Sequence, residues 1–194
     1  MLIPAERFID TPVMSLQTGS ELARTAREII DPFNLVIVAY ELEGRMLDQV
    51  PSLLRIEDIR EVGSMGIIID SVDELISPGD VINIQKIYDY RFELNNKQVI
   101  DEDNRKVGKV VGYTLEAGNF VIQQLRIHRP LLRSFGDTEL LIHRSQIVKI
   151  TDEKITVKSS KVSHDIKEKI DPITKAYENP FRRPQQTNPE TINR

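Results

Sequence analysis

The sequence predicts a mostly β protein: two tandem small β-barrels, joined by a short linker helix and followed by a partly helical or flexible C-terminal tail. Three observations lead to this expectation. The 194 residues allow two small domains, the 40% of hydrophobic residues suffices for a packed core, and a weak internal repeat spans most of the chain. The predicted units are residues 1–80, residues 81–160 and a tail over residues 161–194.

The internal repeat consists of two blocks. At an offset of 85, residues 19–42 lie over residues 104–127. At an offset of 88, residues 53–69 lie over residues 141–157, with apolar residues in matching places. The three extra residues fall between the blocks, and length variation is typical of loops. We therefore expect a duplication, although strand-rich segments can also resemble each other by composition alone. The identical pairs are Asn34/Asn119, Val36/Val121 and Ile37/Ile122.

In the first copy, residues 1–15 are expected to lead into the first barrel. Apolar residues alternate along residues 36–42, which predicts a strand with one buried face and with Glu41 on the other. Residues 31–34 (Asp-Pro-Phe-Asn) are a turn signal before this strand. Residues 63–66 (Gly-Ser-Met-Gly) predict a tight turn that closes the last hairpin of the copy.

The linker covers residues 71–92. Ser71 and Glu74 have the spacing of a capping box, which predicts a short helix that ends at Pro78-Gly79-Asp80. The apolar-rich segment from residue 81 to 87 is expected to be the first strand of the second barrel. In that barrel, Gly118-Asn119 and residues 151–154 (Thr-Asp-Glu-Lys) predict the turns between strands.

The C-terminal segment changes character. Residues 163–178 predict a short helix interrupted near Asp171-Pro172, because proline breaks a helix interior. The remaining residues, rich in proline and polar side chains, predict a flexible end. This end is either a solvated remnant or a docking peptide built around Tyr177, Phe181, Arg182 and Arg183.

Composition argues against several functional classes. The chain has no cysteine and three histidines, which excludes disulfides and thiol nucleophiles and disfavours a metal centre. Carboxylates come in adjacent pairs, and neighbours on a strand point to opposite faces, so they do not converge. We therefore expect no catalytic residues, no cofactor and no metal, and hence no enzyme. No apolar run is long enough to cross a bilayer and no signal peptide is recognisable, which predicts a cytoplasmic protein.

The charges divide the chain. Residues 1–84 carry 6 basic and 15 acidic residues, whereas residues 85–161 carry 14 basic and 10 acidic residues. The basic residues of the second copy gather around the 126–144 loop, where the first copy is acidic. This loop is interpreted either as a site for an anionic partner or as an ordinary solvated loop. The candidate partner-binding residues are Arg126, His128, Arg129, Leu132, Arg133, Phe135 and Arg144.

The second copy resembles the PRC-barrel domain, a family shared by the photosynthetic reaction centre H subunit and a maturation factor of the small ribosomal subunit. The resemblance is carried by residues 104–116 (Asn-Arg-Lys-Val-Gly-Lys-Val-Val-Gly-Tyr-Thr-Leu-Glu) and by Leu141–Ile147 with Ile155–Val157. Asn104 and Gly112 depart from the family's usual Gly and Asp. The first copy, from Gly19 to Ile69, is more divergent. The likeness covers about 150 residues and is closer to two-barrel bacterial proteins than to the maturation factor.

The resemblance implies an interaction module without shared catalytic residues, and a fold alone does not assign a task. We expect a non-enzymatic adaptor or assembly factor in a bacterial cytoplasm, with a protein partner. Self-association and peripheral membrane association through a partner stay open. The alternative is a ribosome- or RNA-associated maturation-type protein that uses the basic loop. The acidic net charge of the chain and its few aromatic residues argue against this alternative. A small-molecule-binding or enzymatic barrel would need an open barrel interior.

Overall fold

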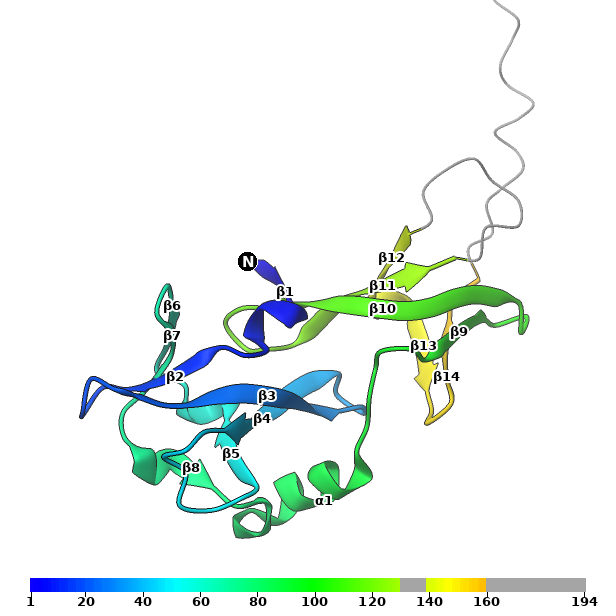
Figure 1. Ribbon diagram of the computed structural model, residues 1–194. Coiled ribbons are helices and arrows are strands. Elements are labelled where there is room, and N and C mark those ends of the chain that lie inside the picture. Colours follow the sequence, from blue (N-terminus) through cyan, green and yellow to red (C-terminus); the bar gives the residue numbers. More distant parts are fainter. Residues whose placement is uncertain (130–138, 160–194) are drawn as a thin grey trace, which may run out of the picture. The chain divides into compact units, whose positions relative to one another are not determined.

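The computed structural model describes residues 1–129 and 139–159 and shows a mostly β chain with two seven-stranded sheets (Figure 1). Both sheets belong to one unit, residues 1–159. The first sheet has the strand order β6-β7-β2-β3-β4-β5-β8. Its strands are β2 (Pro12–Ser15), β3 (Glu21–Asp31), β4 (Val36–Glu43), β5 (Ser52–Arg55), β6 (Glu61–Gly63), β7 (Gly66–Ile69) and β8 (Leu75–Ile76).

The second sheet has the strand order β12-β11-β10-β9-β14-β13, and β1 adds to the edge of β10. In each sheet the long central strands pair antiparallel. Each sheet also has one parallel pair of strands, β2 with β7 in the first sheet and β9 with β14 in the second. The strands are β1 (Leu2–Pro4), β9 (Gln98–Asp101), β10 (Lys106–Glu116), β11 (Ile122–His128), β12 (Glu139–His143), β13 (Ile147–Ile150) and β14 (Lys154–Val157).

The registers of the two sheets repeat each other. Arg24 pairs with Glu43 in the first sheet, and Lys109 pairs with His128, 85 residues later, in the second. Tyr40 pairs with Leu54, and their counterparts at offsets of 85 and 88 pair in the same way. The irregularities on the β3–β4 and β10–β11 ladders also fall at matching places. The two aligned blocks of the sequence therefore form equivalent strands.

The end strands of each sheet do not pair with each other in the part of the chain that the structure describes. This holds for β6 and β8 in the first sheet and for β12 and β13 in the second. The predicted β class is confirmed at the level of two sheets. The two-barrel arrangement stays a prediction, and the predicted boundary at residue 80 is likewise untested.

The linker differs from the sequence-based expectation. Ser71 caps only a 3₁₀ turn, η3 (Val72–Glu74), and the chain then forms β8 and a second 3₁₀ turn, η4 (Pro78–Asp80). The predicted strand over residues 81–87 is wrong, because Ile82–Tyr90 forms the helix α1. Its isoleucines suggested a strand, but Ile84, Ile87 and Tyr88 recur at helical spacing and pack on the first sheet. Two further 3₁₀ turns, η2 (Ile56–Asp58) and η5 (Arg144–Gln146), occupy equivalent places in the copies.

A shared core lies between the sheets, and its centre is locally two-fold symmetric. Val36 and Val121, equivalent in the repeat, form an antiparallel bridge. The amide of Ile37 donates to the carbonyl of Phe120 over 3.1 Å, and the equivalent amide of Ile122 donates to the carbonyl of Leu35 over 2.9 Å. The rings of Phe8, Tyr40 and Phe120 pack together beside this bridge.

The segments that lead into the two copies are exchanged. The N-terminal segment precedes the first sheet, yet β1 and η1 (Ala5–Phe8) contact β10 of the second sheet. Conversely, α1 precedes the second sheet and packs on the first, close to β3 (Figure 1). The N-terminal lead-in therefore extends the second sheet and joins the shared core, whereas α1 forms a separate small cluster with the first sheet.

Candidate functional site

The outward face of the second sheet, on β10, β11 and β12, is the candidate site. Residues paired directly across antiparallel strands lie on the same face. Two rows of cross-strand neighbours, Gly112–Arg126–Leu141 and Lys109–His128–Glu139, therefore lie on one face of the sheet. The buried Tyr113, Leu125 and Ile142 lie on the other face. We call this surface the second outward face. Its side chains are Lys109, Thr114, Gln124, Arg126, His128, Glu139, Leu141 and His143.

The equivalent surface of the first sheet is covered. Ile29, Ala39 and Leu53 form a small apolar cluster with Ile84 of α1. Leu53 is 0% exposed, whereas its counterpart Leu141 is 56% exposed. The same sheet position is thus a core position in the first copy and a surface position in the second.

The surface of the first sheet that α1 covers has an ion pair at its centre. The guanidinium of Arg27 and the carboxylate of Glu41 lie 2.6 Å apart. Tyr88 of α1 lies over this pair: its ring centroid is 5.1 Å from Arg27 Cζ, and its hydroxyl donates to Glu41 Oε1 over 3.4 Å. An aromatic side chain with a donor at its tip suits a carboxylate beside a cation.

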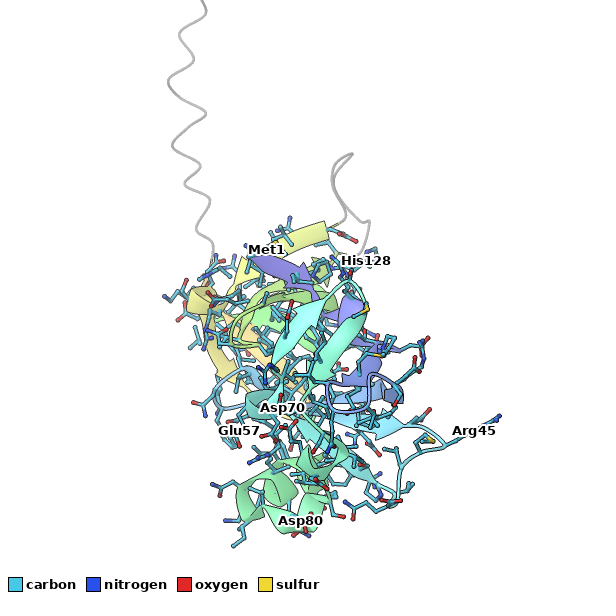
Figure 2. The ribbon with its side chains drawn as sticks, turned by 90° about the vertical axis from the view of Figure 1, so that its left-hand side faces the viewer. Met1, Arg45, Glu57, Asp70, Asp80 and His128 are labelled. Atoms are coloured by element: carbon cyan, nitrogen blue, oxygen red, sulfur yellow. The ribbon has the colours of Figure 1, made fainter. Side chains whose placement is uncertain are left out.

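The second outward face reverses the charge at this centre. Arg126 stands where the first copy has Glu41, His128 where it has Glu43, and Gly112 where it has Arg27. The guanidinium of Arg126 lies over Gly112, since a Cβ there would clash with Arg126 Nη2. The carboxylate of Glu6, from η1, forms an ion pair with Arg126. In Figure 2, His128 lies on the second sheet, whereas the acidic Glu57, Asp70 and Asp80 lie on the first sheet and its linker.

The structure places the predicted site residues in different parts of the molecule. His128 and Arg129 are exposed at the end of β11, next to Arg126. Arg144 does not join them: it lies in η5, and its Nη2 donates to the carbonyl of Asn34 in the first copy over 3.0 Å. The predicted Leu132, Arg133 and Phe135 lie outside the described residues.

Sequence reasoning missed Lys109 and Leu141. Leu141 aligns with the buried Leu53, so its sequence signal is that of a core residue. The signal that could have revealed the open face is the replacement of Ala39 by Gln124 and of Ile29 by Thr114. Apolar contacts under α1 become polar positions there, which indicates that no apolar helix covers this surface.

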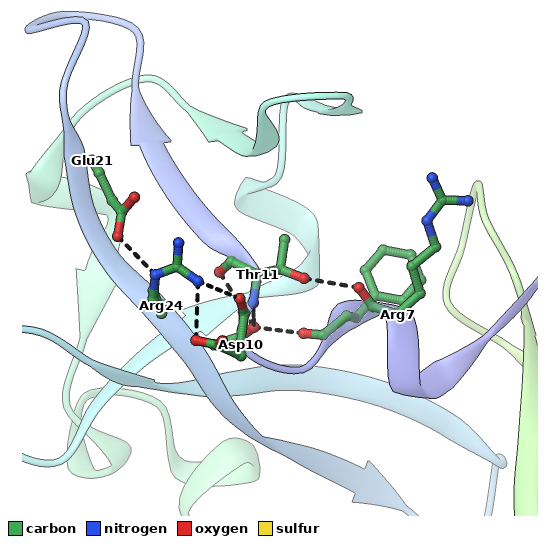
Figure 3. A network of polar contacts seen from close by, with 7 residues as sticks. Arg7, Asp10, Thr11, Glu21 and Arg24 are labelled. Carbon is green, nitrogen blue, oxygen red and sulfur yellow. Dashed lines mark hydrogen bonds and ion pairs between the residues drawn. The ribbon is translucent and has the colours of Figure 1, made fainter.

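A second feature is a surface groove of about 600 Å³ between the N-terminal segment and the β6–β7 hairpin. One wall is held by Arg24, which bonds Asp10 Oδ1 and Glu21 Oε1 over 3.0 Å each (Figure 3). The guanidinium of Arg7 points away from this network in Figure 3. Apart from Arg7 and Asp10, the groove is lined by apolar or hydroxyl-bearing side chains, which supply no general acid or base. These are Met1, Ile3, Phe8, Ile9, Thr11, Pro12, Val62, Ser64 and Met65.

Two buried tyrosines dominate the electrostatics of the core. The hydroxyl of Tyr113 donates to the carboxylate of Glu28, and these two residues are equivalents in the repeat. Burial, and then the charge of Glu28, raises the pKa of Tyr113 well above its ordinary value. Burial also raises the pKa of Tyr40, whose hydroxyl has no hydrogen-bond partner in the described part of the protein.

Residues 1–129 and 139–159 contain no group of three or more His, Asp or Glu placed to hold a metal ion. Among these residues, too, no helix has the length and apolarity needed to cross a membrane. No protein-family model and no curated protein matches the chain.

Proposed function

We propose that the protein is a non-enzymatic protein–protein interaction module, an adaptor or assembly factor, whose partner binds the second outward face. One observation carries this proposal. The same sheet surface occurs twice, and a helix covers it in the first copy but leaves Leu141 exposed in the second. Leu141, 56% exposed on the edge strand β12, lies beside Arg126 and shares its face with His128, Glu139 and His143, which gives the apolar centre and polar rim of a protein interface.

The resemblance to PRC-barrel domains belongs to the same proposal. In this interpretation each sheet is a PRC-like barrel, and the chain is a tandem of two. Six strands of each sheet share their order, β6-β7-β2-β3-β4-β5 in the first and β13-β14-β9-β10-β11-β12 in the second, and the long strands share their register, which supports such a tandem. The family resemblance implies binding to another protein rather than chemistry, which agrees with a binding role for the open face.

The test uses the full chain as bait in native lysate, with and without nuclease, in three forms. These are the wild type, Leu141→Glu, and the control Val148→Glu, which adds the same charge at a residue 51% exposed on β13 of the same sheet. We expect one stoichiometric, nuclease-resistant protein that Val148→Glu retains and Leu141→Glu loses.

Two results would contradict the proposal. If Leu141→Glu retains the partner, the interface lies elsewhere on the chain. If the captured proteins are ribosomal, disappear with nuclease and bind with a steep salt dependence, the RNA-associated alternative replaces this proposal.

A further inference from the structure

We infer that two molecules of this protein associate edge to edge through β12, so that the second sheet of one continues into that of the other across a two-fold axis at Leu141. The inference goes beyond the proposed function, because it concerns the edge of the sheet and not its outward face. It follows from the unpaired side of β12, from the covered edge in the first copy and from the order of residues along β12.

The edge of β12 is unpaired where the equivalent edge of the first sheet is paired. β5 pairs with β4 on one side and with the short strand β8 on the other, where Leu53 lies opposite Ile76. β12 pairs with β11, and among the described residues no strand lies on its other side (Figure 1). The repeat therefore shows that this edge accepts an antiparallel strand, and an unpaired edge is a template for a strand of another chain.

The residues that follow β14 do not repeat the sequence of β8. At the offset of 88, Leu75 and Ile76 correspond to Ser163 and His164, which lie outside the described residues. Leu75 and Ile76 both pack on apolar clusters of the protein. Serine and histidine cannot supply that apolar contact. The sequence therefore favours a strand from a second molecule over the chain's own continuation.

The direction of the backbone in β12 follows from its neighbours. The amide and carbonyl of Val110 bond residues 97 and 96 over 3.0 and 2.9 Å, so they point away from β11. Bonded and non-bonded pairs alternate along an antiparallel ladder. Ile127, opposite Val110, therefore points to β12 and bonds Leu140. The backbone groups of Leu140 thus face β11, and those of the residues on either side of it face the open edge.

The groups at the open edge suit pairing with an identical strand. When Leu141 lies opposite Leu141 of the other molecule, each amide can donate to the other's carbonyl. In the same register the amide of Glu139 can donate to the carbonyl of His143, again in both directions. The amide of His143 is already used, since it donates to Gln146 Oε1 over 2.9 Å. The pairing is isologous, so it closes at two molecules.

The side chains of β12 are complementary in this register. Antiparallel pairing centred on Leu141 places the carboxylate of Glu139 opposite the imidazole of His143 at both ends of the strand. His143 Nδ1 accepts a hydrogen bond from the amide of Ser145 over 3.2 Å, which leaves the ring proton on Nε2 as a donor to a carboxylate. Between these pairs the two exposed Leu141 side chains meet on the same face.

The test is sedimentation equilibrium of the purified full chain between about 10 µM and about 1 mM, a range that suits a small interface. We expect a monomer–dimer equilibrium. Glu139→Lys brings a lysine opposite His143, and His143→Glu brings two carboxylates together, so each should weaken association about tenfold or more. The control Glu153→Lys makes the same change of charge in the exposed turn between β13 and β14 and should leave association unchanged.

An equal mixture of Glu139→Lys and His143→Glu tests the register itself. In a mixed dimer the introduced lysine faces the introduced glutamate at one end, and the Glu139–His143 pair remains at the other. The mixture should therefore associate about as tightly as the wild type, although each variant alone is weakened. A circular-dichroism spectrum confirms that each variant is folded.

Leu141→Pro tests the backbone bonds. Proline removes the amide proton that faces the open edge, and edge strands tolerate proline where this proton faces solvent. We expect a folded monomer. Leu141→Val keeps the amide and is expected to associate like the wild type.

Several results would overturn the inference. One is a wild-type chain that stays monomeric at all these concentrations. Others are a dimer that Leu141→Pro leaves intact, that Glu153→Lys weakens as much as Glu139→Lys does, or that the mixed variants do not restore, because association would then use another surface. These samples contain only this protein, so such a result would leave the binding of a different protein to the second outward face standing.

Discussion

Tyr113 and Tyr40 are both buried, but only one of them has its hydroxyl paired. The hydroxyl of Tyr113 bonds the carboxylate of Glu28, whereas that of Tyr40 is buried without a partner in the described residues. A hydrogen bond to a charged group contributes more than a neutral one, and an unpaired buried hydroxyl costs free energy. Two residues of the same type, in one core, should therefore respond oppositely to loss of the hydroxyl.

Tyr113→Phe should lower the free energy of unfolding by about 1.5–3 kcal/mol, because it leaves the carboxylate of Glu28 without its donor. Tyr40→Phe is the matched control and should be neutral within about 0.5 kcal/mol, or stabilising, because it removes an unpaired polar atom. Urea unfolding of both variants measures the difference. Equal losses of unfolding free energy in the two variants would show that the Tyr113–Glu28 hydrogen bond does not stabilise the folded protein.

The same tyrosines predict how stability depends on pH. The pKa of each is raised in the folded state, whereas in the unfolded chain it is about 10. Below about pH 10 both states hold these protons, so their contribution is fully present. Above it the unfolded state releases protons that the folded state keeps, and the free energy of unfolding falls by about 1.4 kcal/mol per pH unit for each tyrosine.

Urea unfolding between about pH 9 and about pH 11 tests this dependence. The double variant Tyr40→Phe/Tyr113→Phe lacks both groups and should show a shallower alkaline decline than the wild type. An equal decline in the two proteins would place the sensitive groups elsewhere.

At the scale of elements, α1 shows how one segment can satisfy two patterns. Its β-branched residues favour a strand by composition, but the side chains that pack on the sheet, the buried Ile84 and the half-buried Ile87 and Tyr88, lie on one side of a helix. Burial under a sheet decides between these states, because the helical form places Ile84 against Ile29, Ala39 and Leu53. The linker therefore depends on the sheet below it.

Ile84→Ala should destabilise the protein by about 2–3 kcal/mol, since it removes buried methylene groups from a small cluster. Ile82→Ala, in the same helix but 73% exposed, is the control and should change stability by less than about 0.5 kcal/mol. Thermal unfolding measures both. A similar effect of the two substitutions would mean that α1 is not anchored through Ile84.

At the scale of the whole molecule, the exchange of lead-in segments makes the two copies interdependent. β1 pairs with the second sheet and α1 packs on the first, so each lead-in contacts the sheet of the other copy. The shared core is continuous, because buried residues of both sheets form one cluster around the Val36–Val121 bridge. We therefore expect the two copies to unfold together.

Phe120→Ala tests this coupling, because its ring packs on Phe8 and Tyr40 from the other copy's segments. It should lower the free energy of unfolding by about 3–4 kcal/mol and should move both sheets equally. NMR probes at Ala39 in the first sheet and Gln124 in the second, followed through urea unfolding, should give coincident transitions. Two separate transitions would show that the copies are independent units.

Local patterns in the sequence were enough for the strands of the two aligned blocks and for their repetition. Alternating apolar residues and turn signals identify the hairpins, and the offsets of 85 and 88 reproduce the observed registers. They were also enough to single out Arg126 and His128, because their positive charge stands where the first copy is acidic. These properties depend on residues close together in the chain.

The folded arrangement was needed for everything that depends on which surfaces meet. Leu53 and Leu141 have the same sequence signal, yet one is a core residue and the other is exposed, because α1 covers only one sheet. The exchange of lead-ins, the Tyr113–Glu28 bond and the diversion of Arg144 to the carbonyl of Asn34 have the same origin. Each joins residues far apart in the chain, and long-range contacts are set by packing in three dimensions and not by local propensity.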